Sequence, residues 1–345
     1  MKLIAKPPRL VLQRLVKIMN LLKGHDIMCE KSVFIWGIGR SGTHLLYDIL
    51  SLHPSLMCAK TNTRWKKGLW GSMHWGDSTP DKLKGYGIPY EGFQRFWRGA
   101  GLEFEGVGMV LRHQVSAQFI QKVSKRYATL HQDWFWKRGT RYRILDKSPM
   151  YILMIEAIDA VFPDSYHIFC LRDPRAILNS LLRIYRFRER DDVGRGRIDE
   201  IGFWGVVPPG YEAHQHEPLV PRLCWQIQAL HDIGFGSQAL LQDRLIAFRY
   251  ESLLHEAHQA TSDLFQRLAL PDWSEIANLI PQTFPDYSPP WPRPGEPVHE
   301  PYGKVRCYLD EEMEQVTVLN ELAVQLGYDP NQVGAIIAEP IKQSR

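Results

Sequence analysis

Short apolar runs alternate along this chain with longer segments whose apolar residues recur at helical spacing. The segment 32–36 (SVFIW) is a compact apolar run that ends in glycines, which is typical of a buried strand. Further strands are predicted over 56–59, 166–171 and 244–250, and helices over 43–52, 152–161, 173–186, 223–242, 254–268 and 311–327. This alternation predicts an α/β fold in which helices flank a parallel sheet on both faces.

Three stretches between these elements have a different composition. Residues 60–140 have a mixed pattern that predicts helices and loops, residues 188–220 a long polar loop, and residues 281–301 an extended proline-rich loop. Long loops inside compact domains are usually functional or mobile, so 188–220 is a candidate lid over an acceptor. No linker interrupts residues 31–345, which we therefore expect to form one domain.

Residues 1–30 are predicted to form a basic, amphipathic segment before this domain. Lysine and arginine recur there without an acidic residue before Asp26, and basic residues interrupt its apolar part, so a secretory signal is a poor match. We expect a helix packed on the domain; the alternative is a helix lying on an anionic membrane surface through residues 1–25. No run of about 18 apolar residues occurs, so the expected location is cytoplasmic, with peripheral membrane association as the alternative.

Composition narrows the class of partner. A net charge of +4 with 23% charged residues does not suggest a nucleic-acid partner, although its sign suits a pocket for anions. The five cysteines are scattered and form no CxxC pair, so neither a disulfide framework nor a zinc site is predicted.

A glycine-rich loop over 37–44 (GIGRSGTH) carries the first chemical signal. It follows the first predicted strand and precedes a helix, where backbone N–H groups can surround a phosphate. Arg40 adds a cationic fork for phosphate or sulfate oxygens, and Ser41 and Thr43 add hydroxyl donors. The alternative is a tight turn without a ligand, but the clustering of these side chains favours an anion site.

The same loop argues against a magnesium-dependent nucleotide hydrolase or kinase. Gly37 and Gly42 fit the glycines of a Walker loop, but Thr43 and His44 stand where that loop needs Lys and Ser or Thr. A nucleotide that delivers its group without a metal therefore fits better. A metal-dependent phosphotransferase remains the alternative enzyme class.

At this point the sequence resembles a known family. Several segments match, in order and spacing, the motifs of sulfotransferases that use 3′-phosphoadenosine-5′-phosphosulfate (PAPS), most of all the branch of tyrosylprotein and bacterial sulfotransferases. The matching segments are 34–43 (FIWGIGRSGT) with 53–54 (HP), 146–149 (DKSP), 171–180 (LRDPRAILNS), 249–253 (RYESL), 303–306 (GKVR) and 326–328 (LGY). The resemblance implies a P-loop NTPase-like sulfotransferase fold over 31–345 and PAPS as the co-substrate, with no metal.

The resemblance also implies the donor site. Arg172 and Ser180 correspond to the pair that holds the 3′-phosphate, and Tyr250 to a residue near the adenosine. A strand end and the following helix can converge on one phosphate. The alternative use of Arg172 is a salt-bridge cluster with Asp173 and Arg175, where Asp173 is expected to cap the helix. The residues expected to bind the donor are Gly39, Arg40, Ser41, Gly42, Thr43, His44, Arg172, Ser180, Tyr250, Lys304 and Arg306.

Lys147 and Arg40 are the candidates for stabilising the charge that develops on the departing nucleotide. The alternative for Lys147 is an ion pair with Asp146 or a solvated lysine. The general base is open, because residues 59–64 (AKTNTR) hold no carboxylate where some relatives place a glutamate. The candidate bases are His74, Glu91, Glu103, Glu105 and His113, of which His74, between Trp70 and Trp75, suits an acceptor pocket best. The alternative for His74 is a structural or exposed histidine.

The acceptor is not specified by these residues. A carbohydrate, lipid, small molecule or peptide with a hydroxyl or amine group all fit. Trp65, Trp70, Trp75 and Trp97 are candidates for stacking on a sugar ring, and the alternative is that they are core residues. The missing glutamate also leaves open a relative that binds the nucleotide without catalysing transfer.

Overall fold

A computed structural model describes residues 31–58, 104, 106–125, 143–188, 201–284, 297–299, 305–307 and 319–337. The predictions for the N-terminal segment 1–30, for His74 and the tryptophans near it, and for Lys304 lie outside these ranges. Within them, no helix is long and apolar enough to cross a membrane.

Five parallel strands form the central sheet. They are β1 (Val33–Gly37), β2 (Leu56–Cys58), β3 (Arg143–Lys147), β4 (Tyr166–Leu171) and β5 (Leu245–Arg249), in the spatial order β2-β3-β1-β4-β5. β1 pairs with β3 on one side and with β4 on the other, so the glycine loop that follows β1 leaves the centre of the sheet. Because all carboxyl ends of the strands point the same way, residues that follow β1, β3, β4 and β5 meet at one edge.

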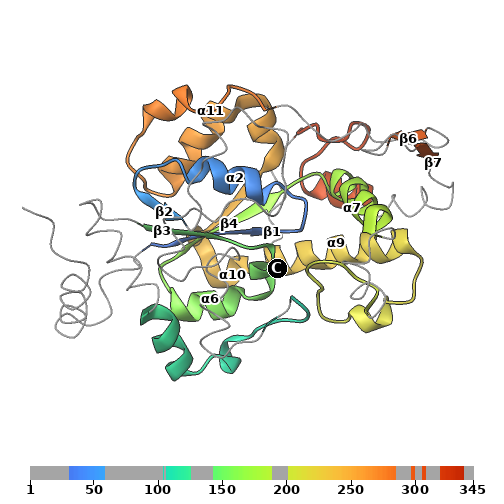
Figure 1. Ribbon diagram of the computed structural model, residues 1–345, viewed down its shortest axis with the longest axis horizontal. Coiled ribbons are helices and arrows are strands. Elements are labelled where there is room, and N and C mark those ends of the chain that lie inside the picture. The colour runs from blue at the N-terminus through green and yellow to red at the C-terminus, as the bar shows by residue number, and fades with distance from the viewer. Residues whose placement is uncertain are drawn as a thin grey trace, which may run out of the picture.

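Helices cover both faces of this sheet, as Figure 1 shows. α2 (Thr43–Leu50) and α11 (Tyr250–Arg267) lie over one face, and α6 (Ile155–Val161), α7 (Pro174–Arg188) and α9 (Leu219–Gly236) pack on the other. The strand β1 serves both cores: its residues 34 and 36 belong to one apolar cluster and residues 33 and 35 to the other, because strand side chains alternate between faces. The predicted α/β fold with a parallel sheet is confirmed.

Several predicted boundaries differ from the structure. β3 was not predicted as a strand, because polar residues at both ends leave only Ile144 and Leu145 as an apolar signal. The predicted helix 152–161 is a 3₁₀ turn (Pro149–Leu153) followed by α6, with a break at Met154 (φ −122°, ψ 13°). The predicted helix 223–242 begins earlier, as α9, and is followed after Ser237 by the short α10 (Gln238–Leu241).

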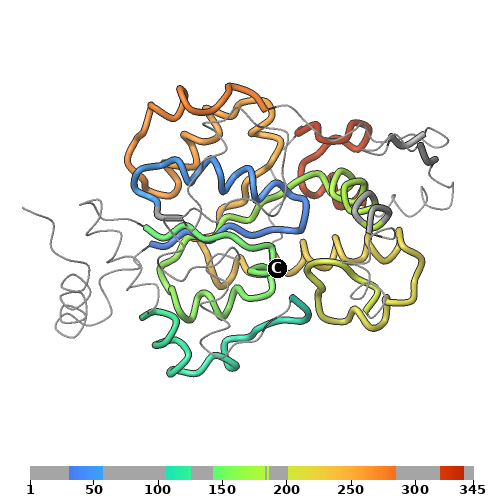
Figure 2. Tube along the Cα trace, viewed as in Figure 1, coloured from blue at the N-terminus to red at the C-terminus, as the bar shows by residue number. Residues whose placement is uncertain are grey.

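The regions near the carboxyl terminus also differ in part from expectation. β5 ends at Arg249, and Tyr250 already begins α11, which has a kink at Glu256. The proline-rich stretch predicted as a loop contains β6 (Pro297–His299), which pairs antiparallel with β7 (Val305–Cys307). Residues 319–325 are helical, within the predicted helix 311–327. The chain trace in Figure 2 shows this C-terminal helix beside α7, far from it in sequence.

The described half of the predicted loop 188–220 is held by specific contacts. The Gln226 side chain on α9 donates to the carbonyl of Val206 (2.6 Å), and the backbone N–H of Val207 donates to the carbonyl of Gly106 (2.7 Å). The backbone N–H of Trp204 donates to the hydroxyl of Tyr185 on α7 (2.6 Å). Residues 201–218 are therefore anchored to two helices and to a second loop.

Candidate active site

The glycine loop makes a tight turn between β1 and α2. The backbone N–H of Ser41 donates to the carbonyl of Ile38 (3.0 Å), and both Arg40 (φ 80°) and Gly42 (φ 88°) adopt the left-handed conformation. Gly42 is the N-cap of α2, and no side chain caps the helix there. The N-cap residue thus offers no side-chain acceptor to the first N–H groups of α2. Such N–H groups at a helix start are the donors that an anion cradle uses.

Gly42 also packs against Tyr250, at the start of α11. A Cβ atom at residue 42 would lie 2.2 Å from Cδ2 of the Tyr250 ring, far inside contact distance. Glycine is therefore needed here twice, for its positive φ and for the close approach of the ring. This contact brings the end of β5 to the glycine loop.

Two arginines and a serine meet beside the loop. The Nε–H of Arg40 donates to Oγ of Ser180 on α7 (2.9 Å), and Nη1 of Arg172 donates to the carbonyl of Arg40 (2.9 Å). Desolvation by the surrounding protein, and then the positive charge of Arg172, lower the pKa of Arg40, although its side chain keeps exposed surface. The guanidinium groups of Arg40 and Arg172 repel each other beside the glycine loop. A bound phosphate or sulfate would offset this repulsion, so the arrangement suits an anion.

Arg172 lies at the β4–α7 junction, where its side chain contacts the glycine loop and Tyr250. Its guanidinium stacks over the Tyr250 ring, 4.6 Å from the ring centroid, and the residue is 7% exposed. Asp173 instead pairs with Arg175 (2.7 Å) and caps α7 by accepting from the Arg175 backbone N–H (2.9 Å). The salt-bridge cluster therefore forms between Asp173 and Arg175, while these contacts of Arg172 go to the loop and to Tyr250.

Lys147 reaches the same region from the end of β3. Its ammonium group donates to Nε2 of His44, 2.9 Å away in the first turn of α2. The carboxylate of Asp146 accepts from the hydroxyl of Tyr151 (2.6 Å) and from the backbone N–H of Lys147 (2.7 Å). The Lys147 side chain thus extends toward the glycine loop, and β3, the strand that sequence reasoning missed, places it there.

One hydroxyl of the loop lacks a partner. Ser41 is fully buried, and its Oγ makes no hydrogen bond with any described residue. Buried hydroxyl groups are nearly always hydrogen-bonded. A ligand bound in the loop could supply the partner that the Ser41 hydroxyl lacks.

Two other residues of the loop lie in the protein interior or near a ring. Thr43 is buried. Gly39 lies beside Trp204: a Cβ atom at residue 39 would be 3.9 Å from Cζ3 of that ring.

Comparison with known proteins places this geometry in a family. The family model described as "Sulfotransferase family" matches residues 32–275, which is more than half of the chain. The chain belongs to the sulfotransferase family. The match begins just before β1 and includes the glycine loop, Lys147, Arg172, Ser180 and Tyr250, and it confirms the predicted resemblance.

Individual relatives of this sulfotransferase are distant. A protein-tyrosine sulfotransferase of Drosophila melanogaster is 23% identical over 150 residues, which cover 44% of this chain and 25% of that protein. A putative protein-tyrosine sulfotransferase of Caenorhabditis briggsae is 23% identical over 153 residues, covering 44% of this chain and 43% of that protein. The aligned region thus spans less than half the length of either relative.

Two solved sulfotransferase structures illustrate the structural similarity to this chain. The sulfotransferase domain of the Synechococcus PCC 7002 olefin synthase has a TM-score of 0.42 at 15% identity, covering 88% of this chain and 97% of that chain. A sulfotransferase from Mycobacterium avium has a TM-score of 0.44 at 16% identity, covering 78% of this chain and 70% of that chain.

The structure brings most of the predicted donor-site residues of this sulfotransferase together. Residues 39–44, Lys147, Arg172, Ser180 and Tyr250 all lie at the carboxyl edge of the sheet. The backbone of Arg306 lies in β7, and Lys304 and His74 are outside the described residues. Of the other candidate bases, only His113 is described, on an exposed 3₁₀ turn (Arg112–Gln114), so the assignment of the base stays a prediction.

Sequence reasoning missed two residues near this site. Trp204 lies beside Gly39, in a segment that was predicted only as a loop; its position between two glycines, in 202–205 (GFWG), was the available signal. Glu251 was noted only as part of a motif, yet it is 2% exposed and accepts a hydrogen bond from the backbone N–H of Asp173 (3.0 Å). No sequence pattern indicates that partnership, because 78 residues separate the two positions.

Proposed function

We propose that this protein transfers a sulfuryl group from PAPS to a hydroxyl or amine group of an acceptor. The observation that carries the proposal is the meeting of Arg40, Arg172 and Ser180 beside the glycine loop at the sheet edge. We infer two adjoining anion sites there, one at the glycine loop and one at Arg172 and Ser180, joined by the Arg40–Ser180 contact. A nucleotide with phosphate groups on both the 5′ and 3′ positions fits two such sites, whereas ATP or ADP would use only the first.

The residues present suit each part of this donor. The N–H groups of the loop and the buried Ser41 hydroxyl would hold the 5′-phosphosulfate, and Arg172 and Ser180 the 3′-phosphate. We expect Tyr250 to contact the adenosine end, and the packing of its ring on Gly42 and under Arg172 supports this. His44, also expected to bind the donor, contributes through its hydrogen bond with Lys147.

We infer that the transfer is an in-line displacement at sulfur. The acceptor oxygen or nitrogen forms a bond to sulfur and loses its proton to a base, and the bond from sulfur to the bridging phosphate oxygen breaks. Negative charge then develops on that oxygen. Lys147 and Arg40 are placed to stabilise this charge by electrostatics, and the leaving product is 3′,5′-bisphosphoadenosine.

The acceptor, the base and the cellular location remain predictions. The two relatives are named for protein tyrosine, which makes a tyrosine peptide a sensible first acceptor, tested beside sugar, lipid and small-molecule hydroxyls. The cytoplasmic location and a membrane contact through residues 1–25 are separate hypotheses. Sedimentation of full-length and truncated protein with anionic vesicles tests the membrane contact, and equal partitioning of the two would exclude it.

A nucleotide-binding experiment tests the donor assignment. A ligand of the native state raises thermal stability with the logarithm of its concentration over Kd, so titrations with 3′,5′-bisphosphoadenosine and with ADP can be compared directly. We expect tighter binding of the bisphosphate, and we expect Arg172→Ala to remove most of that preference. A mutant that discriminates as the wild type does would show that the 3′-phosphate assignment is wrong.

A kinetic experiment tests the chemical step. Lys147→Ala should lower kcat and kcat/KM to a similar extent, on the order of 10²–10³, because the ammonium acts mainly on charge that develops in the transition state. Arg40→Ala should raise KM as well, since Arg40 also contacts the ground state. Lys122→Ala removes an exposed lysine outside the site and serves as the charge-matched control. A near-normal kcat for Lys147→Ala would transfer the role to another cation.

Metal-dependent phosphotransfer is tested in the same assays. The proposal expects chelator to leave the sulfuryl-transfer rate unchanged. Magnesium-dependent turnover of ATP would instead favour the alternative enzyme class. Binding of the bisphosphate without transfer to any acceptor in the panel would favour a non-catalytic relative.

A further inference from the structure

Each of two residues of the proposed donor site is followed in the chain by an acidic residue whose carboxylate is buried and bonded outside that site. Arg172 is followed by Asp173, and Tyr250 by Glu251; these two carboxylates are 0% and 2% exposed. The backbone N–H of Asp173 donates to Oε1 of Glu251 (3.0 Å), which links the end of β4 to the start of α11. Two contacts therefore join the same two chain segments: the stack of Arg172 on Tyr250 and the buried hydrogen bond between Asp173 and Glu251.

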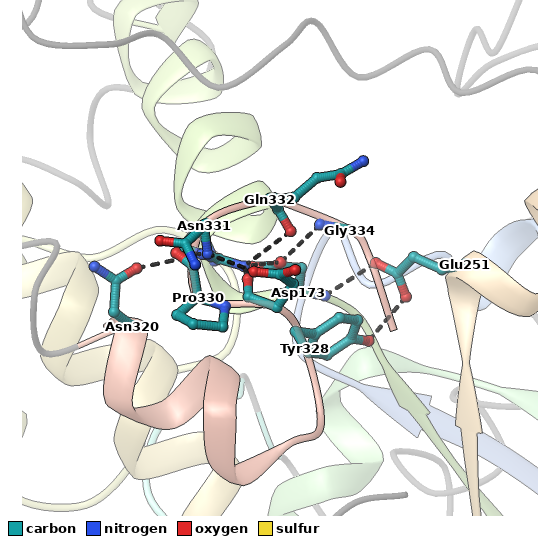
Figure 3. A network of polar contacts seen from close by, with 10 residues as sticks. Asp173, Glu251, Asn320, Tyr328, Pro330, Asn331, Gln332 and Gly334 are labelled. Atoms are coloured by element: carbon teal, nitrogen blue, oxygen red, sulfur yellow. Dashed lines mark hydrogen bonds and ion pairs between the residues drawn. The ribbon is translucent and has the colours of Figure 1, made fainter. Parts of the chain in front are cut away.

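The segment 319–337 holds both carboxylates, as Figure 3 shows. The hydroxyl of Tyr328 donates to Oε2 of Glu251 (2.8 Å), and the backbone N–H of Gly334 donates to Oδ2 of Asp173 (2.8 Å). We call this group, formed by Asp173, Glu251, Tyr328 and Gly334, the carboxyl clasp. Asp173 and Glu251 lie within residues 32–275, the part of the chain that the family model matches, whereas Tyr328 and Gly334 lie beyond it.

Arg175 fastens the same segment from α7. Its guanidinium pairs with Asp173 and donates to the carbonyls of Asp329 (2.7 Å) and Pro330 (2.8 Å). On the other side, Nη2 of Arg249 donates to the carbonyl of Leu326 (2.8 Å). The segment is thus bound both to the β4–α7 junction that carries Arg172 and to the β5–α11 junction that carries Tyr250.

The electrostatics of the clasp are coupled to the donor site. Burial raises the pKa of Glu251 to about 7, while the Asp173 N–H, the Tyr328 hydroxyl and the charge of Arg172 act in the opposite direction. Arg172 therefore interacts electrostatically with Glu251 and also donates a hydrogen bond to the glycine loop. Hydrogen bonds to buried charged groups are worth more than those at the surface, so the clasp can fix the geometry of its neighbours.

From these contacts we propose that segment 319–337 positions Arg172 and Tyr250 for the 3′-phosphate of the nucleotide, with Tyr328 and Glu251 as positioning residues. This inference rests on the proposed function, because it assigns the Arg172 side of the site to the 3′-phosphate. Neither residue needs to touch the nucleotide. Glu251 acts through Tyr250, its neighbour in the chain, and through the backbone of Asp173, which follows Arg172. Tyr328 acts through its hydrogen bond to Glu251.

Tyr328→Phe is the sharpest test, because it removes one hydroxyl and keeps the ring. The loss of one buried hydrogen bond corresponds to about a three- to tenfold change in an equilibrium constant. We expect the affinity for 3′,5′-bisphosphoadenosine to fall by that factor while the affinity for ADP changes little. In turnover, KM for the donor should rise and kcat should change less.

Ser165→Ala is the matched control. Ser165 is fully buried just before β4, at the opposite end of the strand from Arg172, and its hydroxyl contacts a buried side chain, Nε2 of His167 (3.0 Å). This variant should lower thermal stability without altering the ratio of the two nucleotide affinities. Glu251→Gln, which keeps the side-chain size and removes the charge, replaces Tyr328→Phe if that variant does not fold, and it should reduce the same ratio.

The outcomes separate the two proposals. If the wild type shows no preference for the bisphosphate, the donor assignment fails and this inference fails with it. If the wild type prefers the bisphosphate but Tyr328→Phe and Glu251→Gln keep the wild-type ratio, the donor assignment stands and the clasp is only structural. An equal fall of the ratio in Ser165→Ala would mean that general loss of stability, and not the clasp, changes nucleotide preference.

Discussion

Replacement of Gly42 by alanine tests whether the glycine loop and Tyr250 form one unit. The new methyl group meets two separate obstacles, a backbone φ of 88° and a Tyr250 ring atom 2.2 Å from the position of its Cβ. The left-handed backbone costs an alanine about 1–2 kcal/mol relative to glycine. Movement of the ring to a normal contact distance would disrupt the stack with Arg172, worth about 0.5–2 kcal/mol.

Together these two effects predict a loss of about 1.5–4 kcal/mol in the free energy of unfolding for Gly42→Ala. Urea denaturation without ligand measures it. Gly39→Ala is the matched control in the same loop, because φ of Gly39 is not positive and the nearest atom to its Cβ, in Trp204, is 3.9 Å away. We expect that variant to lie within about 0.5 kcal/mol of the wild type.

A double mutant separates the two obstacles. In a Tyr250→Ala background the ring is gone, so Gly42→Ala should cost only the backbone part, about 1–2 kcal/mol. Nucleotide titration of Gly42→Ala should also show weaker binding of 3′,5′-bisphosphoadenosine, because the displaced ring no longer supports Arg172. Equal stability of the Gly42 and Gly39 variants, or the same cost in both backgrounds, would refute the reasoning.

Three further predictions concern the core. Gly234→Ala should destabilise by about 1–2 kcal/mol because its Cβ would lie 2.5 Å from the Phe169 ring, whereas Gly236→Ala, with no atom within 4 Å, should be neutral or stabilising; urea denaturation of both gives the sign. Burial, then the charge of Arg244, lowers the pKa of His167 from 6.5 to about 3, so this histidine should remove about 1.4 kcal/mol of stability per pH unit as pH falls below 6.5. Relative to His167→Gln, the wild type should lose stability faster between pH 7 and 4, and parallel curves would contradict this. Burial raises the pKa of the Cys170 thiol, so alkylation mapped by mass spectrometry should label it only after unfolding.

Local pattern determined much of the fold and the position of the glycine loop. The strand 166–171 was predicted with its observed bounds, because a mostly apolar run, broken only by His167, is bordered by the polar Ser165 and Arg172. Residues 37–44 could be assigned to an anion cradle because the chemistry there comes from consecutive residues between a strand and a helix. The pairing of Arg172 with Ser180 came from the family resemblance, and the geometry of a strand end followed by a helix is compatible with it.

Only the tertiary structure decided the partnerships between distant segments. β3 carries a weak apolar signal and becomes a strand because β1 and β2 pair with it on either side, and this pairing places Lys147 beside His44. The contact of Tyr250 with Gly42 and the carboxyl clasp around Glu251 join residues that no local pattern relates. Hydrophobic periodicity reports which face of an element is buried, but not which neighbour covers it. The choice among buried polar partners therefore depends on how the parallel strands bring their carboxyl ends to one edge.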